Sequence, residues 1–457
     1  MKNMSRDEIL NGNMLKTIFI LSIPVVINSF LQTMYNLTDT YWIGKLGTEE
    51  LAAINLVTPM QNMIVNFGSG ITVAGSVLIS QYLGAKRDEE ARSMANQIFA
   101  CAIIFSVFCA GICSLTAGNI VTWLGAEDEI FGYAKTYLQL VVLDMPFLFT
   151  INMYTSSHQA EGDTLTPMLL NLLGIVLNLF LDPMLMVVLN WGAAGAALAT
   201  VFSKMICAVI AFVALHNRKR LVYLDLKKLK FEREKLVLIV TVGLPSAIGG
   251  SVQQLGFLIL SRNVFAYGKQ AMAAYGIGNK INGIISLPSS GLGSATAIIV
   301  GQNYGAGQIK RAQKATLISS AMAVAFLLVG GFVLSRAPVS RSVVKIFTED
   351  PEVIGMASEF LSIMAFWCFA NGVHDCVNGF FKGIARTTVP MAVDISRLWI
   401  FRFGTLYICE YVLHMGVRSI WYAVVVSNGI AAVILLVLYL SGVWKKWKPK
   451  VKKKHVT

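Results

Sequence analysis

Residues 22–44 of the chain read SIPVVINSFLQTMYNLTDTYWIG. They belong to an apolar segment that begins near Met14 and is long enough, at about 1.5 Å per residue, to cross a lipid bilayer as a helix. Pro24 removes one backbone hydrogen bond from this helix, so we expect a hinge there. Asp39 lies near the far end, and an acid inside a membrane segment usually serves a proton, an ion or a partner in the bundle. The alternative is that Asp39 reaches the interface near Lys45 and is only solvated.

The composition indicates an integral membrane protein. The chain has 457 residues, of which 55% are hydrophobic and 14% are charged, and its mean hydropathy is +0.64. A soluble core could not absorb that much apolar surface, so we expect an all-α protein with many membrane spans. The first apolar segment is too long for the core of a signal peptide. The seven cysteines lie in apolar runs without metal-ligand spacing, which predicts neither disulfides nor a metal cluster.

Positive charge is concentrated in two places. Residues 216–235 hold eight Lys and Arg against three acids, and residues 442–457 hold seven Lys and no acid. Both stretches flank membrane segments, so the excess of positive charge on cytoplasmic loops explains them better than a nucleic-acid partner does. We therefore expect a multi-pass protein of the cell membrane with both termini in the cytoplasm.

Apolar segments of helical length recur along the whole chain, and they predict twelve transmembrane helices. They lie near residues 14–44, 52–82, 95–118, 130–157, 165–189, 193–215, 236–264, 272–300, 315–336, 352–381, 388–412 and 419–441.

An internal repeat relates the two halves of the chain. Pro24 matches Pro245 at an offset of 221, and the same offset pairs Gln32 with Gln253. Six predicted helices separate the copies, so the halves have the same orientation, as in transporters built from parallel repeats. We therefore expect two six-helix bundles and a linker. The predicted segments are an N-terminal bundle at 1–215, a basic cytoplasmic linker at 216–235, a C-terminal bundle at 236–441 and a basic cytoplasmic tail at 442–457.

Polar residues of the first half form a candidate ion and substrate site. Asn178 and Asp182 are four residues apart on one helix face, and Pro183 frees backbone carbonyl oxygens beside them. With Asp39 and Thr200 they form a set of hard oxygen ligands suited to H⁺ or Na⁺, with Asp39, Asp182 and Asn178 as candidate Na⁺ ligands. The alternative is a polar latch between helices. The full candidate set is Asp39, Asn178, Asp182, Thr200, Tyr35, Gln32 and Asn152.

The second half does not repeat these acids. The counterpart of Asp39 is Leu260, and no acid lies near the counterpart of Asp182, which falls around Thr405. The second half has its own polar set, in which Asp394 and Arg397 are three residues apart and predict a structural or gating ion pair. We interpret Asp375 as part of that set, His374 as a weak candidate pH sensor, and leave Asp144 and Lys280 without a role. There is no phosphate-binding loop, nucleophile elbow or HExxH motif, so we expect neither an enzyme nor a cofactor.

Several short motifs together resemble the multidrug and toxic compound extrusion (MATE) family over nearly the whole chain. They are Tyr-Asn-Leu-Thr-Asp-Thr at 35–40, Gln-Tyr-Leu-Gly-Ala at 81–85, Glu-Gly-Asp-Thr at 161–164, Leu-Asp-Pro at 181–183 and Gln-Asn-Tyr-Gly-Ala at 302–306. Other branches of the family carry acids where this chain has Gln253 and Asn371, so it is most similar to the DinF-like branch. The resemblance implies coupling roles for Asp39, Asn178, Asp182 and Thr200, and bending at Pro24.

We therefore expect a V-shaped, monomeric secondary antiporter in the lipid bilayer that exports amphipathic, mostly cationic drugs or toxic compounds in exchange for H⁺ or Na⁺. The alternative is a flippase for a lipid-linked precursor, which would need a cationic cavity to hold a diphosphate. An integral-membrane transferase would need clustered acids or histidines at the membrane face, and the sequence has none.

Overall fold

The computed structural model describes residues 4–447 and 450–451, so half of the predicted tail at 442–457 lies outside the described residues. The chain divides into two compact units. One comprises Met1–Glu8 and Ile27–Ile248, and the other comprises Ile9–Val26 and Gly249–Thr457. Two long helices, α2 (Met14–Ile43) and α10 (Arg233–Phe265), contain these boundaries, each within a few residues of its internal proline. The four-segment division expected from the sequence stays a prediction, as does the hinge at Pro24.

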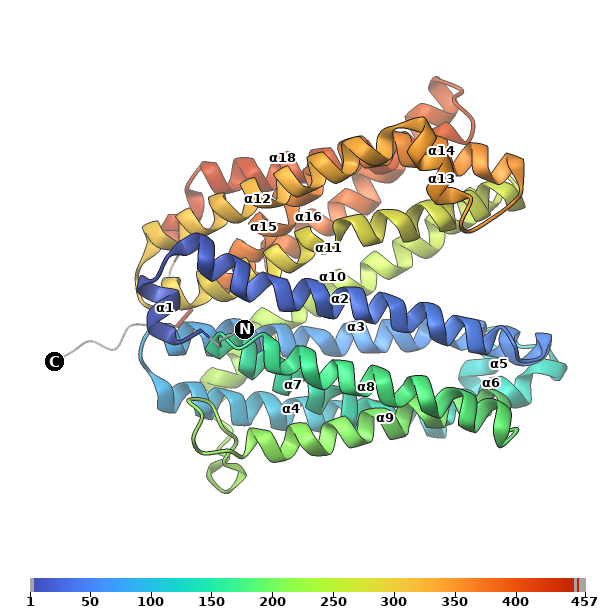
Figure 1. Ribbon diagram of the computed structural model, residues 1–457. Coiled ribbons are helices and arrows are strands. Elements are labelled where there is room, and N and C mark those ends of the chain that lie inside the picture. The colour runs from blue at the N-terminus through green and yellow to red at the C-terminus, as the bar shows by residue number, and fades with distance from the viewer. Residues whose placement is uncertain (1–3, 448–449, 452–457) are drawn as a thin grey trace. The chain divides into compact units, whose positions relative to one another are not determined.

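The first unit is a helical bundle whose core lies among α3, α4, α6 and α9 (Figure 1). Buried Ala, Val, Ile and Leu side chains of these helices form that core, including Val57 and Leu138. Besides parts of α2 and α10, its elements are α3 (Thr48–Gly84), α4 (Asp88–Leu115), α5 (Ala117–Trp123), α6 (Asp128–Val141), η1 (Val142–Asp144), α7 (Met145–Glu161), α8 (Leu165–Pro183), the π-helical turn η2 (Met184–Val188), α9 (Gly192–Leu215) and η3 (Leu226–Lys228).

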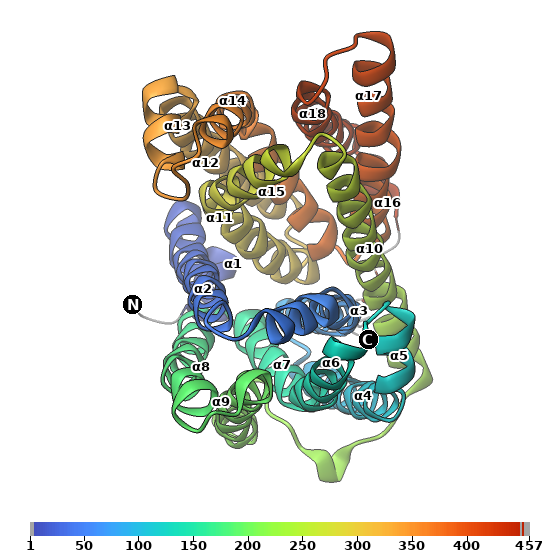
Figure 2. The same cartoon turned by 90° about the vertical axis from the view of Figure 1, so that its right-hand side faces the viewer.

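The second unit is a bundle of the same kind, in which α11 packs against α12, α14 and α15 (Figure 2). An aromatic cluster of Tyr275, Phe360 and Trp421 fills one part of its core. Besides parts of α2 and α10, its elements are α11 (Lys269–Gly305), α12 (Ile309–Ser335), α13 (Ala337–Val344), α14 (Pro351–Trp367), α15 (Phe369–Gly383), α16 (Thr388–Ser396), the π-helical η4 (Arg397–Arg402), α17 (Phe403–Tyr407), the π-helical η5 (Ile408–Val412), α18 (Arg418–Leu440) and η6 (Val443–Lys446). The short helix α1 (Arg6–Asn11) contains the first boundary between the units.

Many of the predicted spans are long, apolar helices. Among the described residues, ten helices are long and apolar enough to cross a membrane, and α14 with α15 makes an eleventh span that is bent by 52°. The predicted segment 388–412 is helical throughout, but it alternates α- and π-helical turns and is not one regular helix. The all-α architecture expected from the sequence is confirmed, with two of its spans irregular.

The sequence repeat is also a structural repeat. Helices α3 and α11 have 37 residues each, and they begin and end 221 positions apart. Near the ends of the halves the offset becomes 224, since this spacing separates η2 from η5. A π-helical turn accommodates one extra residue in a helix. Helices α8 and α16 already begin 223 positions apart, so the turn η4, which has no counterpart in the first half, accounts for the last of the three added residues.

The basic linker 216–235 packs against the first unit. The Arg220 guanidinium lies 2.8 Å from the Glu161 carboxylate at the end of α7, and the Val222 amide donates to the same carboxylate at 2.8 Å. Farther along, the Asp225 amide donates to the side chain of Asn96 on α4 at 3.0 Å. These contacts attach the linker to two helices of the bundle.

Close backbone approach holds α11 against α15 in the second unit. A Cβ atom built on Gly379 would lie 2.2 Å from the Gly293 carbonyl oxygen, and one built on Gly293 would lie 2.7 Å from the Asp375 carbonyl oxygen. Small residues at helix interfaces let backbones approach in this way, and in a membrane such packing replaces much of the hydrophobic driving force.

We expect Gly379→Ala to destabilise the protein, because overpacking a tight helix interface costs roughly 1–3 kcal/mol. The matched control is Gly276→Ala on α11, where no atom lies within 4 Å of the built Cβ atom. The measurement is the thermal unfolding midpoint of each purified variant in detergent. Equal midpoints for the two variants would contradict this account of the interface.

Candidate ion- and substrate-binding site

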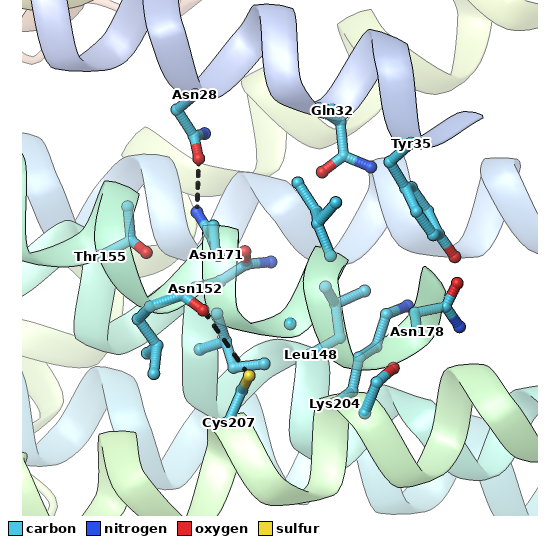
Figure 3. Close-up of a pocket in the computed structure, with 15 residues that line it drawn as sticks. Asn28, Gln32, Tyr35, Leu148, Asn152, Thr155, Asn171, Asn178, Lys204 and Cys207 are labelled. Atoms are coloured by element: carbon cyan, nitrogen blue, oxygen red, sulfur yellow. Dashed lines mark hydrogen bonds between the residues drawn. The ribbon is translucent and has the colours of Figure 1, made fainter. Parts of the chain in front are cut away.

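A cavity of about 270 Å³ lies within the first unit, between α2, α7, α8 and α9. Figure 3 shows Gln32 and Tyr35 of α2 on one side and Asn178 of α8 with Lys204 of α9 on the other. At one end the Asn171 side chain donates a 3.0 Å hydrogen bond to Asn28. The cavity is lined by Asn28, Gln32, Tyr35, Leu148, Ile151, Asn152, Thr155, Leu170, Asn171, Gly174, Ile175, Asn178, Ser203, Lys204 and Cys207.

The structure brings the predicted site residues into one region. Four of the seven line the cavity directly, namely Gln32, Tyr35, Asn152 and Asn178. Asp39 and Asp182 do not line the cavity. Their carboxylates are close enough to interact electrostatically with each other. Thr200 lies beside the side chain of Tyr35, which itself interacts with both acids. Four helices, α2, α7, α8 and α9, thus contribute to one polar cluster.

Asn178 and Asp182 are fully buried on α8. Within the part of the chain that the structure describes, neither amide atom of Asn178 forms a hydrogen bond, and neither does Oδ1 of Asp182. Buried polar atoms normally have partners, and the exceptions are often sites for ions or water. Both residues lie near the end of α8, just before η2, so the candidate residues fit a small cation such as H⁺ or Na⁺.

Transition-metal chemistry has no matching cluster in the described part of the chain. No group of three or more His, Cys, Asp or Glu residues there could hold a metal ion. The candidate Na⁺ ligands are oxygens of two carboxylates and one amide, which suit a hard cation.

Lys204 and Asp144 form an ion pair that the sequence analysis missed. Lys204 lies in the middle of the apolar helix α9 and lines the cavity, while Asp144 in η1 is 1% exposed. Lys204 also interacts electrostatically with Asp39. The two partners are 60 residues apart on different elements, so no helical spacing predicts the pair. In the sequence, the only indication of this pair is a charged residue inside each of two apolar segments.

The polar set of the second unit is a connected network. Asp394 lies 3.3 Å from Arg397, as their spacing predicted, and 3.0 Å from Nε2 of His374. Nδ1 of His374 lies 3.1 Å from Asp375, which also accepts a 2.6 Å hydrogen bond from Ser289. A gating role for Asp375, Asp394 and Arg397 stays a prediction. Lys280 is exposed and remains without a role.

The chain is similar to known proteins over most of its length. The MatE family model matches residues 24–184 and 245–408, one match in each half. The chain is 24% identical over 432 residues to the probable multidrug resistance protein YoeA of Bacillus subtilis, covering 93% of each chain. It is 24% identical to the multidrug export protein MepA of Staphylococcus saprophyticus, covering 81% of this chain and 82% of the relative.

Solved structures agree with these relatives. A crystal structure of MATE in complex with MaL6 superposes with a TM-score of 0.91 at 25% identity, covering 97% of this chain and 100% of that chain. The outward-facing conformation of a multidrug resistance MATE family transporter of the MOP superfamily gives a TM-score of 0.89 at 26% identity, covering 98% and 100%. With a family model that matches both repeats and solved structures that match nearly its whole length, the chain belongs to the MATE family of membrane transporters.

Proposed function

We propose that this protein is a secondary antiporter that exports amphipathic, mostly cationic drugs or toxic organic compounds across the cell membrane in exchange for H⁺ or Na⁺. The observation that carries the proposal is the polar cluster beside the first-unit cavity, where Asp39 and Asp182 lie near the cavity while the cation that lines it, Lys204, is already paired with Asp144. The names of YoeA and MepA, which describe multidrug resistance and export, support the substrate class. A flippase is not favoured, since a diphosphate would be repelled by these acids.

Exchange of drug for ion follows if the two compete for the same carboxylates. A cationic drug and a proton both stabilise the carboxylates of Asp39 and Asp182, but both cannot neutralise the same group at once. Protonation from outside therefore favours drug release, and loss of the proton inside restores the negative site. Two states that differ in affinity for ion and drug are sufficient to couple the two flows.

The nature of the coupling ion depends on the oxygens around Asp182. If the ion is Na⁺, we propose that it is held by Asp182, Asn178 and Asp39, and that protons compete with it. Apolar contact area for varied drugs comes from residues such as Leu148 and Ile151 of α7. We also propose the DinF-like branch, a monomer, cytoplasmic termini and bending of α2 at Pro24, as the sequence predicts.

The direct test is export of a cationic dye from proteoliposomes under separately imposed H⁺ and Na⁺ gradients. We expect one gradient, or both, to drive transport of the dye against its concentration. Transport that neither gradient accelerates would contradict the antiport proposal.

We expect Asp39→Asn to abolish ion-driven dye export with normal expression, because losing an intramembrane charge lowers the cost of insertion. The matched control is Glu89→Gln, which removes an exposed acid from the first turn of α4. Export is measured in proteoliposomes that contain equal amounts of each variant. Undiminished export by the Asp39 variant would remove this residue from the mechanism.

We expect binding of a cationic dye to weaken as the pH falls, because protonation removes the negative charge that attracts it. In Asp182→Asn this dependence should be flatter. The measurement is dye affinity of purified protein from about pH 5 to about pH 9, a range that covers histidine titration and the upper end of ordinary carboxylate titration, with and without Na⁺. An affinity that does not change with pH in the unaltered protein would exclude a shared site for proton and dye.

Lys204 is the cation already present in the proposed drug site. Replacing it by Met leaves the buried Asp144 carboxylate without its partner, which costs about 3–5 kcal/mol in comparable buried pairs. We therefore expect Lys204→Met to lower the thermal unfolding midpoint, and the double variant Asp144→Asn with Lys204→Met to recover most of the loss. A single variant as stable as the unaltered protein would show that the pair is not needed for the fold.

A further inference from the structure

A second cavity, of about 230 Å³, lies within the second unit. It occupies the repeat-equivalent place to the first cavity. Gln253 lines it as Gln32 lines the first, and the two glutamines are 221 positions apart. Asn428 lines it as Lys204 lines the first, at the offset of 224 that applies to the final helices. The two cavities therefore share equivalent lining positions, although the second is also lined from α11, whose counterpart α3 does not line the first.

The charged residues of the second unit differ from those of the first at equivalent positions. At these offsets the counterparts of Asp39 and Asp182 are Leu260 and Leu406, both buried in one hydrophobic cluster. The counterpart of Asn178 is Arg402, the last residue of the π-helical turn η4. The two arginines at the ends of η4, Arg397 and Arg402, both line the cavity. The second copy thus lacks both acids of the first, and its cavity is lined by two arginines and one acid, Asp375.

Arg402 is held in place without a carboxylate partner. Its side chain is 3% exposed. Nε donates to Ser427 at 3.0 Å, Nη2 donates to Asn428 at 2.8 Å, and the guanidinium lies 5.7 Å from the centre of the Phe257 ring. All these partners are neutral, and no described carboxylate forms an ion pair with Arg402. A guanidinium has five N–H donors, so donors remain for a ligand.

The acids nearby are already satisfied by other donors. Asp394 is paired with Arg397 and His374, and Asp375 accepts from Ser289 and faces the other ring nitrogen of His374. Because both ring nitrogens face carboxylate oxygens, a doubly protonated His374 donates to both acids. With His374 and Arg397 balancing the two acids, the charge of Arg402 is left over.

From this geometry we infer that the second-unit cavity is a binding site for an organic anion, whose carboxylate or similar group pairs with Arg402. An uncompensated cation in a membrane segment is costly, and a bound anion removes that cost. The cavity also exceeds the needs of a simple ion, since about 10–15 Å³ of such space holds a water molecule. Its apolar walls at Phe257, Tyr275 and Met364 fit a small aromatic or aliphatic body.

The probe is a matched pair, 1-naphthaleneacetate and its uncharged amide, with equilibrium dialysis against the full-length protein in detergent. We expect the carboxylate to bind and the amide to bind at least about tenfold more weakly, as for loss of a charge-assisted hydrogen bond. Arg402→Gln should lose the preference for the carboxylate. The matched control is Arg418→Gln, which removes a half-exposed arginine that pairs with Glu359 in the same unit.

A second variant keeps the test decisive if Arg402→Gln fails to fold. Asn428→Asp places a carboxylate at the position that now accepts from Arg402, so it should neutralise the site and abolish preference for the carboxylate while preserving the bundle. Equal binding of acid and amide to the unaltered protein, or unchanged preference in Asn428→Asp, would overturn the inference.

Chloride distinguishes a site for organic anions from one for inorganic anions. The dialysis is repeated at low and at high chloride concentration, with no other carboxylate in the buffer. We expect the carboxylate to bind in both. The proposal of an organic ligand would be overturned by two results together: chloride displaces the carboxylate completely, and the unfolding midpoint depends on chloride in the unaltered protein but not in Arg402→Gln. Because binding is measured without transport, these results are independent of those that test cation export.

Discussion

A charged group within the hydrocarbon layer must have a partner, a proton or a bound ion, and the arrangement of this protein's polar residues follows from that constraint. Asp144 meets it with Lys204, and Asp394 meets it with Arg397 and His374. Asp182 has an oxygen without a hydrogen-bond partner among the residues described. The ion pairs balance the charges of Asp144 and Asp394, whereas Asp182 forms no ion pair with the described residues and is available to a ligand that comes and goes.

Duplication allows one scaffold to carry two different environments. The helices of the two units correspond in length and order, and their cavities are lined from equivalent positions. Backbone packing needs small residues at the contacts, as at Gly293 and Gly379, but it does not constrain the charge inside a cavity. One copy can therefore hold acids and the other arginines without a change of fold.

The features that sequence reasoning predicted were those encoded by regular spacing. Segment length predicted the helices, the offset of 221 predicted the repeat, and the four-residue separation of Asn178 and Asp182 predicted their shared face. The pair of Lys204 with Asp144 was missed because tertiary contact between distant helices has no such spacing. Arg402 was missed because the register between the copies changes by one residue inside η4, which hides its equivalence to Asn178.

The π-helical turn η4 has a consequence for how the two halves diverged. Inserting one residue into a regular α-helix would rotate every later side chain by about 100° and misplace the rest of the helix against its neighbours. A π turn confines that insertion to a single wide loop of the helix, so Leu406 and the segment beyond keep their packing while Arg397 and Arg402 acquire new directions. A gap of one residue between internal repeats is thus a marker, readable in any duplicated transporter, of the place where one copy departed from the other.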